Sequence, residues 1–195
     1  MKTIYCYIYP DFADFEVTIL VHRLRNAGGY KVVTLAETEE PVMSQSGLRY
    51  LPDKRISQAD AHEAAGLIIP GGPICNEQNA IVPLVQQMDK QEKLLAAICF
   101  GPQFLGRAGV LDRHTYTTSC SEETIRQLNV CDPFPRCNFR SARVWQDGHV
   151  ITAPGHAPVD FAAQICRYFS VYRDAAQEYS QLFNICDTEE GSRHA

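Results

Sequence analysis

Two short, wholly apolar runs limit the folds open to this chain more than any other feature. One is Leu94–Ile98, with the sequence LLAAI, and the other lies in AGLIIPGG and ends at Gly71 and Gly72. Successive side chains of a strand point to opposite faces of a sheet, so a strand without polar residues must be covered on both faces. Strands of that kind belong to parallel sheets flanked by helices. The sequence therefore predicts an α/β protein.

Strand-like and helix-like segments alternate along the chain. Thr3–Tyr9 is predicted as a strand, Phe15–Ala27 as a helix with Asp14 as its N-cap, and YKVVTLAE as the next strand. Further along we expect a small hairpin or excursion in PVMSQSGLRYLPDKR, helices at Ala80–Lys93 and Gly101–Ala108, a strand in HTYTTS, a helix in SEETIRQL, a loop in CDPFPRCNF, a hairpin in SARVWQDGHVITAPG, and helices in APVDFAAQICRYFSVY and DAAQEYSQLFNIC. This order predicts an open three-layer α/β/α sandwich with a mostly parallel sheet. We expect one domain over residues 1–186 and a frayed tail at 187–195.

The charge balance and the cysteine count narrow the possible partners and compartment. The formal net charge is −5, and nucleic acid or an anionic membrane as the main partner would require a basic face. No apolar run approaches the roughly 18 residues of a membrane span, and the N-terminus does not resemble a signal peptide. Eight cysteines in 195 residues do not indicate the disulfide scaffold of a much shorter secreted chain. We therefore expect a reduced, cytoplasmic protein.

Cys99 stands where the apolar strand Leu94–Ile98 meets the next predicted helix. A residue there lies at the carboxyl edge of the sheet and faces a helix N-terminus. An ordinary cysteine, with a pKa near 8.5, is only about 3% thiolate at pH 7, and a helix end that lowers the pKa to about 5.5 would make it almost wholly thiolate. This position favours a nucleophile, although a buried, inert cysteine is the alternative reading.

Two other segments are expected at the same edge of the sheet. The backbone N–H groups of Gly71 and Gly72, with that of Phe100, would form an oxyanion hole, or the glycine pair is only a turn. Glu16, early in the first predicted helix, would hold a proton and donate it in a hydrogen bond to the sulfur, which would lower the thiol pKa. The alternative role for Glu16 is an acidic residue that favours the helix dipole.

Five motifs, in order and at matching spacing, resemble the ThiJ/PfpI superfamily, the DJ-one/PfpI group related to class I glutamine amidotransferases. They are YPDFADFE, LIIPGG, AAICFGPQFLGRAGVL, TYTTS and HVITAPGHAPVDFA. The resemblance implies a flavodoxin-like sandwich, frequent homodimers, a reactive cysteine at Cys99 and a carboxyl at Glu16 that contacts the thiol. Activities in that superfamily include amide or peptide hydrolysis, glyoxalase and deglycase chemistry, isonitrile hydration, and redox sensing without clear turnover.

The chain departs from this superfamily at two positions. Phe100 replaces the histidine that follows the cysteine in the protease-like members, and Cys120 stands where relatives often carry histidine. Peptidase activity therefore becomes a weaker prediction. His156, in PGHAP, belongs to a loop that lies near the cysteine in relatives and would orient or deprotonate a substrate, or it is a solvated loop histidine.

The function predicted from the sequence is a cysteine-dependent hydrolase or lyase that acts on small carbonyl or amide compounds. Cys99 would attack, Glu16 would tune the sulfur or carry a proton, and no cofactor or metal ion is expected. A small molecule would be the substrate and a second copy of the chain the partner. The competing hypothesis is a stress-responsive redox sensor or chaperone-like protein that uses oxidation of Cys99.

Overall fold

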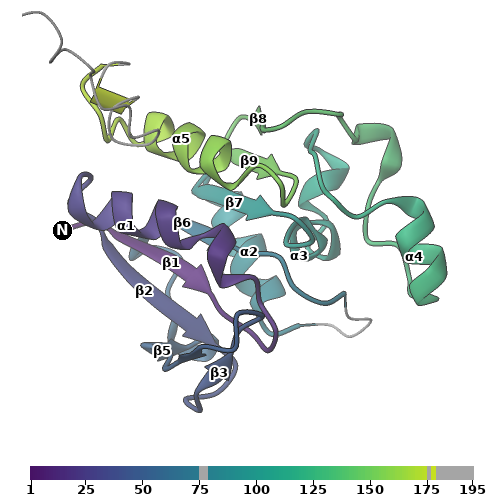
Figure 1. Cartoon of the computed structure of the whole chain (residues 1–195), viewed down its shortest axis with the longest axis horizontal. Coiled ribbons are helices and arrows are strands. Elements are labelled where there is room, and N and C mark those ends of the chain that lie inside the picture. The colour runs from purple at the N-terminus through teal and green to yellow at the C-terminus, as the bar shows by residue number, and fades with distance from the viewer. Residues whose placement is uncertain (75–78, 175–176, 179–195) are drawn as a thin grey trace, which may run out of the picture.

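The apolar runs form central strands of a seven-stranded sheet in the computed structural model, which describes residues 1–74, 79–174 and 177–178 (Figure 1). Every side chain of Leu94–Ile98 is fully buried. The strands of the sheet are β1 (Thr3–Tyr7), β2 (Lys31–Ala36), β5 (Lys54–Arg55), β6 (Ala64–Ile69), β7 (Leu94–Ile98), β8 (Trp145–Asp147) and β9 (Val150–Ala153).

The order of the strands places a crevice at the carboxyl edge of the sheet. The order is β5-β2-β1-β6-β7-β9-β8, with all neighbours parallel except the antiparallel pair β8 and β9. From β1 the chain moves outward to β2 and later returns to the other side of β1 to form β6. In open α/β sheets, ligands bind beyond the carboxyl ends of the strands at such a reversal. The loops after β1, β6 and β7 therefore surround the favoured position for a site.

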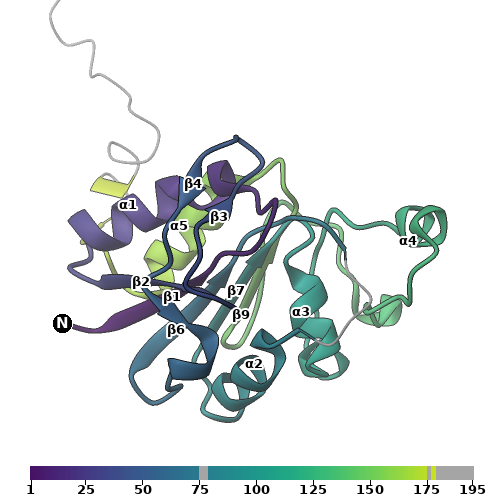
Figure 2. The ribbon, with the colours of Figure 1, turned by 90° about the horizontal axis from the view of Figure 1, so that it is seen from below.

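Helices cover both faces of the sheet, as two views at right angles show (Figures 1 and 2). The contacts of α1 with α5 and β2 place these two helices on one face, and the contacts of α2 and α3 with β7 place those on the other. The helices are α1 (Thr18–Asn26), α2 (Ile81–Lys90), α3 (Pro102–Arg107), α4 (Glu122–Leu128) and α5 (Pro158–Tyr168), with short 3-10 turns η1 (Asp14–Glu16), η2 (Ile56–Gln58), η3 (Val110–Asp112) and η4 (Arg136–Asn138). The predicted three-layer α/β/α sandwich is confirmed.

The segment around the expected small hairpin contains one strand more than predicted. β3 (Val42–Met43) and β4 (Arg49–Tyr50) form the antiparallel hairpin, and Gly47 between them has φ +77°. A positive φ suits glycine, because it has no Cβ to clash with the backbone. β5 then pairs parallel with β2 and closes one edge of the large sheet. With only two residues, it has no hydrophobic period by which the sequence could reveal it.

Two local predictions are wrong. HTYTTS forms no strand, because its pairing is limited to one isolated parallel bridge between Tyr116 and Phe139, in which Tyr116 N–H donates to Asn138 O at 3.2 Å. The next N–H, that of Thr117, donates to the side-chain oxygen Thr152 Oγ1 at 2.8 Å. Asp14 is not an N-cap either. Its carboxylate accepts hydrogen bonds from the hydroxyls of Ser46 (2.7 Å) and Tyr50 (2.9 Å), which tie the β3–β4 hairpin to η1.

Several predictions concern parts of the chain that the structure only partly describes. The last predicted helix falls mostly outside the described residues and the tail at 187–195 entirely so, and the expectation of one domain ending at residue 186 stays a prediction. The described cysteines are free thiols at positions 6, 99, 120, 131, 137 and 166. None of the helices in the described ranges has the length and apolar character that crossing a bilayer requires.

Candidate active site

Cys99 forms a strained turn between β7 and α3. Its φ is +61°, a left-handed conformation that costs a non-glycine residue of the order of 1–3 kcal/mol and persists only where the surroundings impose it. Its N–H donates to Ala153 O at 2.8 Å, and its carbonyl accepts from Ser119 N–H at 3.1 Å and from Thr118 Oγ1 at 2.6 Å. The turn presents a partly exposed thiol at the carboxyl edge of the sheet.

Glu16 brings a buried carboxyl group to this thiol. It is the last residue of η1, and only 3% of it is exposed. Its Oε2 accepts a hydrogen bond from Gly71 N–H at 2.7 Å, and its carboxyl group is hydrogen-bonded to the Cys99 thiol. The sequence pattern places Glu16 in the first helix, whereas in the structure α1 begins two residues later, at Thr18. The loops after β1, β6 and β7 thus meet at one carboxyl–thiol pair.

Two glycines leave the space that this pair occupies. A Cβ on Gly71 would stand 2.6 Å from both Glu16 Oε2 and Cys99 Cβ. A Cβ on Gly155, in the loop after β9, would stand 2.8 Å from both Cys99 Sγ and Glu16 Oε1. Neither residue has a φ that demands glycine, so close approach to the pair explains both glycines.

Gly71→Ala is expected to disturb the pair and to lower the free energy of unfolding by about 1–3 kcal/mol, the typical result of overpacking. The matched control is Gly66→Ala, whose Cβ would meet Leu94 Cβ at 2.9 Å in the sheet and touch neither Cys99 nor Glu16. Denaturant unfolding should show destabilisation of both variants. Alkylation of the Cys99 thiol by iodoacetamide, measured on the folded protein, should change only in Gly71→Ala. Equal alkylation rates in both variants would contradict this reading of Gly71.

The pKa values of both members of the Cys99–Glu16 pair are raised. Burial and the adjacent Glu16 carboxylate raise the pKa of the Cys99 thiol to about 12, although hydrogen bonds from Ser119 and from Phe100 N–H act in the opposite direction. Burial also raises the pKa of Glu16, against hydrogen bonds from Cys99 and Gly71. Two unit charges about 4 Å apart at an effective dielectric constant of 20 repel by ~4 kcal/mol, or about three pKa units. The site therefore avoids carrying two anions and shares one proton between sulfur and carboxyl.

The sequence-based reason for a low thiol pKa at Cys99 was wrong. It invoked the N-terminus of the following helix, but α3 has only 6 residues and offers a short row of peptide dipoles. Loss of water on burial, and then charge repulsion from the Glu16 carboxylate, raise the thiol pKa instead of lowering it. A thiol whose pKa is raised in this way favours its protonated form at neutral pH.

The expected oxyanion donors require one correction. Gly71 N–H is already used by Glu16, so it is not a donor for a substrate oxygen. Phe100 N–H is hydrogen-bonded to the Cys99 sulfur, and its role toward a substrate oxygen stays a prediction. Gly72 is buried against Tyr9, whose ring would lie 2.6 Å from a Cβ there, so its lack of a side chain accommodates that ring. The role of Gly72 N–H stays a prediction.

Sequence reasoning missed Ser119. Its Oγ accepts a hydrogen bond from Gly155 N–H at 2.7 Å, which directs its own hydroxyl hydrogen elsewhere, and it hydrogen-bonds to the Cys99 sulfur. Ser119 directly precedes Cys120, the residue that stands where relatives often carry histidine. Cys120 itself is buried, with 1% exposed. The only signal in the sequence was the hydroxyl run Thr117-Thr118-Ser119, which the strand prediction absorbed.

The sequence profile of the DJ-1/PfpI family matches residues 2–168. The chain belongs to the DJ-1/PfpI family. The match spans every strand of the large sheet and the three loops that carry Glu16, Gly71 and Cys99.

Individual relatives in this family are distant. An uncharacterized protease, YoaZ of Bacillus subtilis, is 24% identical over 188 residues, which cover 88% of this chain and 85% of the relative. The glutathione-independent glyoxalase DJR-1.2 of Caenorhabditis elegans is 30% identical over 105 residues, 52% of this chain and 56% of the relative. The crystal structure of the DJ-1 superfamily protein Atu0886 from Agrobacterium tumefaciens superimposes with a TM-score of 0.79 at 27% identity and covers 94% of this chain and 97% of that one.

The remaining predicted residue, His156, lies beside the pair but outside it. It follows Gly155 directly, and its side chain is exposed. The loop after β9 therefore lies next to the Cys99 turn, as expected. A role for the His156 imidazole toward a substrate stays a prediction. A pocket of about 390 Å³ has Ser119, a hydrogen-bond partner of Cys99, in its wall, but neither Cys99 nor Glu16 lines it; its lining consists of Thr118, Ser119, Cys120, Ser121, Glu122, Glu123, Arg136 and Phe139. A larger pocket, of about 490 Å³, lies over α1 and β2 and does not include Cys99.

Proposed function

We propose that this DJ-1/PfpI protein is a cysteine-dependent enzyme that acts on small carbonyl or amide compounds, with Cys99 as nucleophile and Glu16 as the group that takes and returns its proton. The observation that carries the proposal is the buried Glu16 carboxyl hydrogen-bonded to the thiol in the strained turn. An adjacent base activates a nucleophile whose own pKa is too high for the working pH. Burial also raises the pKa of Glu16, which makes its carboxylate a stronger base.

The proposed reaction begins with one proton transfer. Glu16 accepts the proton of the Cys99 thiol as the sulfur attacks the substrate carbonyl carbon, so that a C–S bond forms and the carbonyl π electrons move to oxygen. Phe100 N–H would donate to that oxyanion, a contact typically worth ~3 kcal/mol of barrier. Glu16 then gives its proton to the oxygen of an aldehyde adduct, or to the departing nitrogen of an amide, which leaves a thioester on Cys99. In a 2-oxoaldehyde adduct the Glu16 carboxylate would next move the proton from the former aldehyde carbon to the neighbouring carbon, which also gives a thioester. Water would hydrolyse either thioester to a carboxylic acid and the free thiol. In this reaction sequence the Cys99 sulfur and the Glu16 carboxyl group never carry a negative charge at the same time, which agrees with the repulsion expected between two anions in the site.

Two observations support a small substrate for Cys99. The pocket of about 390 Å³ that includes Ser119, a hydrogen-bond partner of the Cys99 sulfur, lies near the lower end of the range for small-molecule sites, although Cys99 itself does not line it. The similar proteins with named activities include a glyoxalase and the deglycase TK1284 of Thermococcus kodakarensis. A 2-oxoaldehyde is therefore the first probe, and a small chromogenic amide is the second.

Turnover of these probes tests the proposal. The purified full chain should convert methylglyoxal without added cofactor, and intact-mass analysis should detect an adduct confined to Cys99 at early times. The amide probe should be hydrolysed if the adduct loses nitrogen instead of being reprotonated. The proposal fails if neither probe is consumed at any pH between 6 and 10 while circular dichroism shows a folded protein.

The alternative function is redox sensing through oxidation of Cys99. Donors that surround the sulfur, from Ser119 and from Phe100 N–H, would also hold the oxygens of a sulfinate. The raised thiol pKa weighs against it, because the thiolate is the species that reacts readily with peroxide. Slow oxidation of Cys99 together with turnover would support the enzyme, whereas fast, selective oxidation without turnover would support the sensor.

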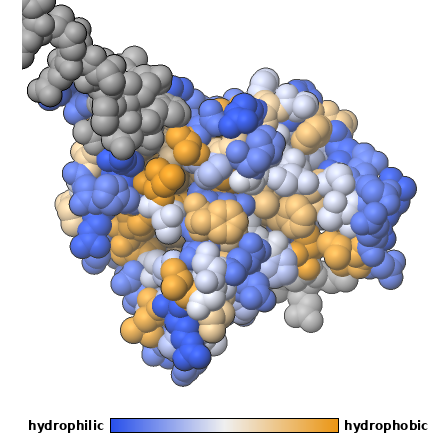
Figure 3. All heavy atoms as spheres, viewed as in Figure 1, coloured by the Kyte–Doolittle hydropathy of each residue, from blue (hydrophilic) through white to orange (hydrophobic). Residues whose placement is uncertain are grey.

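We also propose a homodimer, formed through an apolar patch beside the site. Figure 3 shows apolar side chains among polar ones over the face that carries α1 and the β3 hairpin. The patch is defined by the exposed residues Phe15, Ile19, Met43, Leu48 and Leu51. Phe15, which is 52% exposed, adjoins the buried Glu16, and the hydrogen bonds of Asp14 hold the hairpin against η1. A second copy seated here would fix the turn that carries Glu16.

Substitution in the patch should dissociate the dimer. We expect sedimentation velocity to show a dimer for the wild type and a monomer for Leu48→Asp/Leu51→Asp, because two charges would be desolvated at the interface. The control is Leu128→Asp, a change at a comparably exposed leucine on α4 outside the patch (50% exposed, against 56% for Leu48). A monomeric wild type at micromolar concentration would refute the proposal.

A further inference from the structure

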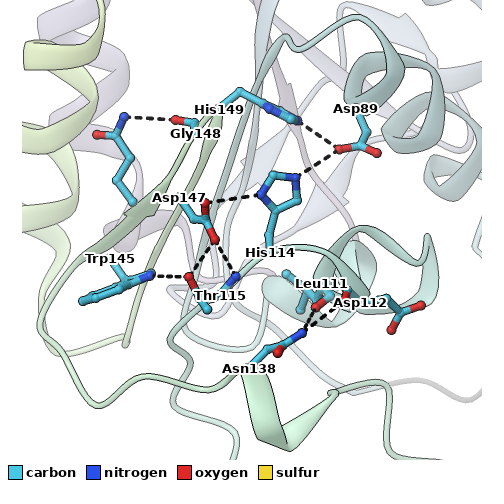
Figure 4. A network of polar contacts seen from close by, with 11 residues as sticks. Asp89, Leu111, Asp112, His114, Thr115, Asn138, Trp145, Asp147, Gly148 and His149 are labelled. Atoms are coloured by element: carbon cyan, nitrogen blue, oxygen red, sulfur yellow. Dashed lines mark hydrogen bonds and ion pairs between the residues drawn. The ribbon is translucent and has the colours of Figure 1, made fainter.

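A cluster of two histidines and an aspartate lies at the edge of the sheet opposite Cys99. Asp89 lies near the end of α2, His114 follows η3, and His149 stands in the turn that leads into β9, where its carbonyl accepts from Leu95 N–H at 2.9 Å (Figure 4). β7 and β9 begin at this edge and end at the carboxyl edge where Cys99 lies. The cluster therefore has no part in the chemistry proposed for the thiol.

The ligand atoms of the cluster converge on one point. His149 Nε2 lies 2.9 Å and His114 Nε2 3.8 Å from the same oxygen, Asp89 Oδ1. One ligand atom from each residue lies within 4.8 Å of the others. The side chains are 7% (Asp89), 17% (His114) and 13% (His149) exposed, so the point is shielded but can be reached from solvent. In a tetrahedral Zn²⁺ site, bonds of about 2.0–2.2 Å place neighbouring ligand atoms roughly 3.3 to 3.6 Å apart. The observed separations lie on both sides of that range.

A second carboxylate faces the other nitrogen of His114. Asp147 Oδ2 is occupied by Thr115, whose N–H and hydroxyl donate to it at 2.8 and 2.7 Å. Asp147 Oδ1 lies 3.8 Å from His114 Nδ1, as Figure 4 shows. Metal-binding histidines commonly direct their second ring nitrogen to a carboxylate, which fixes the tautomer that binds the metal. Asp147 is placed to do this for His114.

His114 lacks a satisfactory partner in the absence of a cation. Its Nδ1 is buried and lies too far from any acceptor for a hydrogen bond of normal length, because both ring nitrogens stand 3.8 Å from the nearest carboxylate oxygens. With the ring proton on Nδ1, the lone pair of Nε2 faces the negative Asp89 Oδ1. Two acceptors that face each other need a positive charge between them. Either a proton on the ring or a metal ion at the shared point would supply it.

We propose that Asp89, His114 and His149 bind a divalent transition-metal ion of the Zn²⁺ class. Two imidazole nitrogens and one carboxylate oxygen are ligands that zinc prefers, and a fourth position would remain for water. Binding replaces the proton that His149 Nε2 shares with Asp89 and releases it to solvent. The salt bridge from Arg113 to Asp89 Oδ2 leaves Oδ1 for the metal and orients the carboxylate. The ion would join α2, the η3 turn and β9, and would act as a structural clip.

Metal titration of the full chain tests the proposal. Co²⁺ should bind one equivalent with a tetrahedral visible spectrum and without the charge-transfer band of a thiolate ligand. Zn²⁺ should displace it and raise the melting temperature, because a ligand that binds only the folded state stabilises it. Asp89→Asn and His149→Gln should each weaken binding by at least tenfold. His22→Gln, at an exposed histidine on α1, is the control and should leave binding unchanged.

A further variant separates a metal site from a merely structural network. Asp147→Asn keeps an oxygen for Thr115 but removes the charge that faces His114, so Co²⁺ affinity should fall about 10–100-fold while circular dichroism remains unchanged. The proposal is overturned by a thiolate band, by equal binding in wild type and His149→Gln, or by ring NMR spectra in which the His114 signals titrate with pH but do not respond to Zn²⁺. The last result would assign the positive charge to a proton.

Discussion

Cys99→Ser should lower kcat/KM for methylglyoxal by at least about 10³-fold, or about 4 kcal/mol of transition-state stabilisation. A serine hydroxyl is far less acidic than a thiol, so Glu16 would not remove its proton at neutral pH. Sulfur is also the more nucleophilic atom even when only a small fraction is ionised. The loss should appear in kcat, since the hydroxyl occupies the same space and leaves the pocket beside Ser119 intact. Steady-state kinetics with product quantification would measure it.

The control for this substitution is Cys131→Ser, a change at an exposed loop cysteine. It should retain full activity, as should the wild type after the exposed thiols at Cys131 and Cys137 have been blocked. Denaturant unfolding of Cys99→Ser should give a midpoint close to that of the wild type. Undiminished turnover in Cys99→Ser would assign the chemistry to another group and would remove the basis of the proposed function.

Much of the architecture could be predicted because it depends on local pattern. Leu94–Ile98 is a strand with the predicted bounds, since a wholly apolar run of that length fits only a covered strand. The hairpin expected around Asp147-Gly148 forms between β8 and β9, although its turn is Gly148-His149, because Asp147 still pairs with Val150 as the last residue of β8; Gly148 has φ +60°. Ser121 caps α4 by accepting a hydrogen bond from Thr124 N–H at 3.0 Å. Each of these features is decided within a few residues along the chain.

The predictions that failed involve partners distant in sequence. Asp14 has the composition of a helix cap, but hydroxyls more than 30 residues away in the β3–β4 hairpin claim its carboxylate. Gly71 N–H looked available for a substrate, yet Glu16 from another loop accepts it. The three metal-ligand candidates are separated by 25 residues or more along the chain, so no spacing motif marked them. The pKa of Cys99 likewise depends on a charge brought in by folding, and only the turn that holds it was visible locally.

Glu16→Gln should raise the reactivity of Cys99 toward iodoacetamide while lowering turnover. In the wild type, burial and the Glu16 charge raise the thiol pKa to about 12, so alkylation should increase steeply through the alkaline range without a plateau below pH 9. Glutamine removes the charge and keeps an oxygen for Gly71 N–H, so the pKa falls and the thiolate fraction at pH 8 rises. Turnover should nevertheless fall about 10²–10⁴-fold, the usual contribution of a general base.

This opposite response separates the two roles assigned to Glu16. A protonated glutamic acid that stabilises a resting thiolate would give a wild-type alkylation midpoint below pH 7, and Glu16→Gln would not speed alkylation. If the Glu16 carboxylate receives the proton during attack, Glu16→Gln should be alkylated faster and turn over substrate more slowly than the wild type. The substitution removes the negative charge that disfavours the thiolate, and it also removes the base that activates the thiol. Glu37→Gln, an exposed change at the end of β2, should alter neither rate. Mass-spectrometric alkylation profiles and kcat/KM, measured on the same preparations, decide between them.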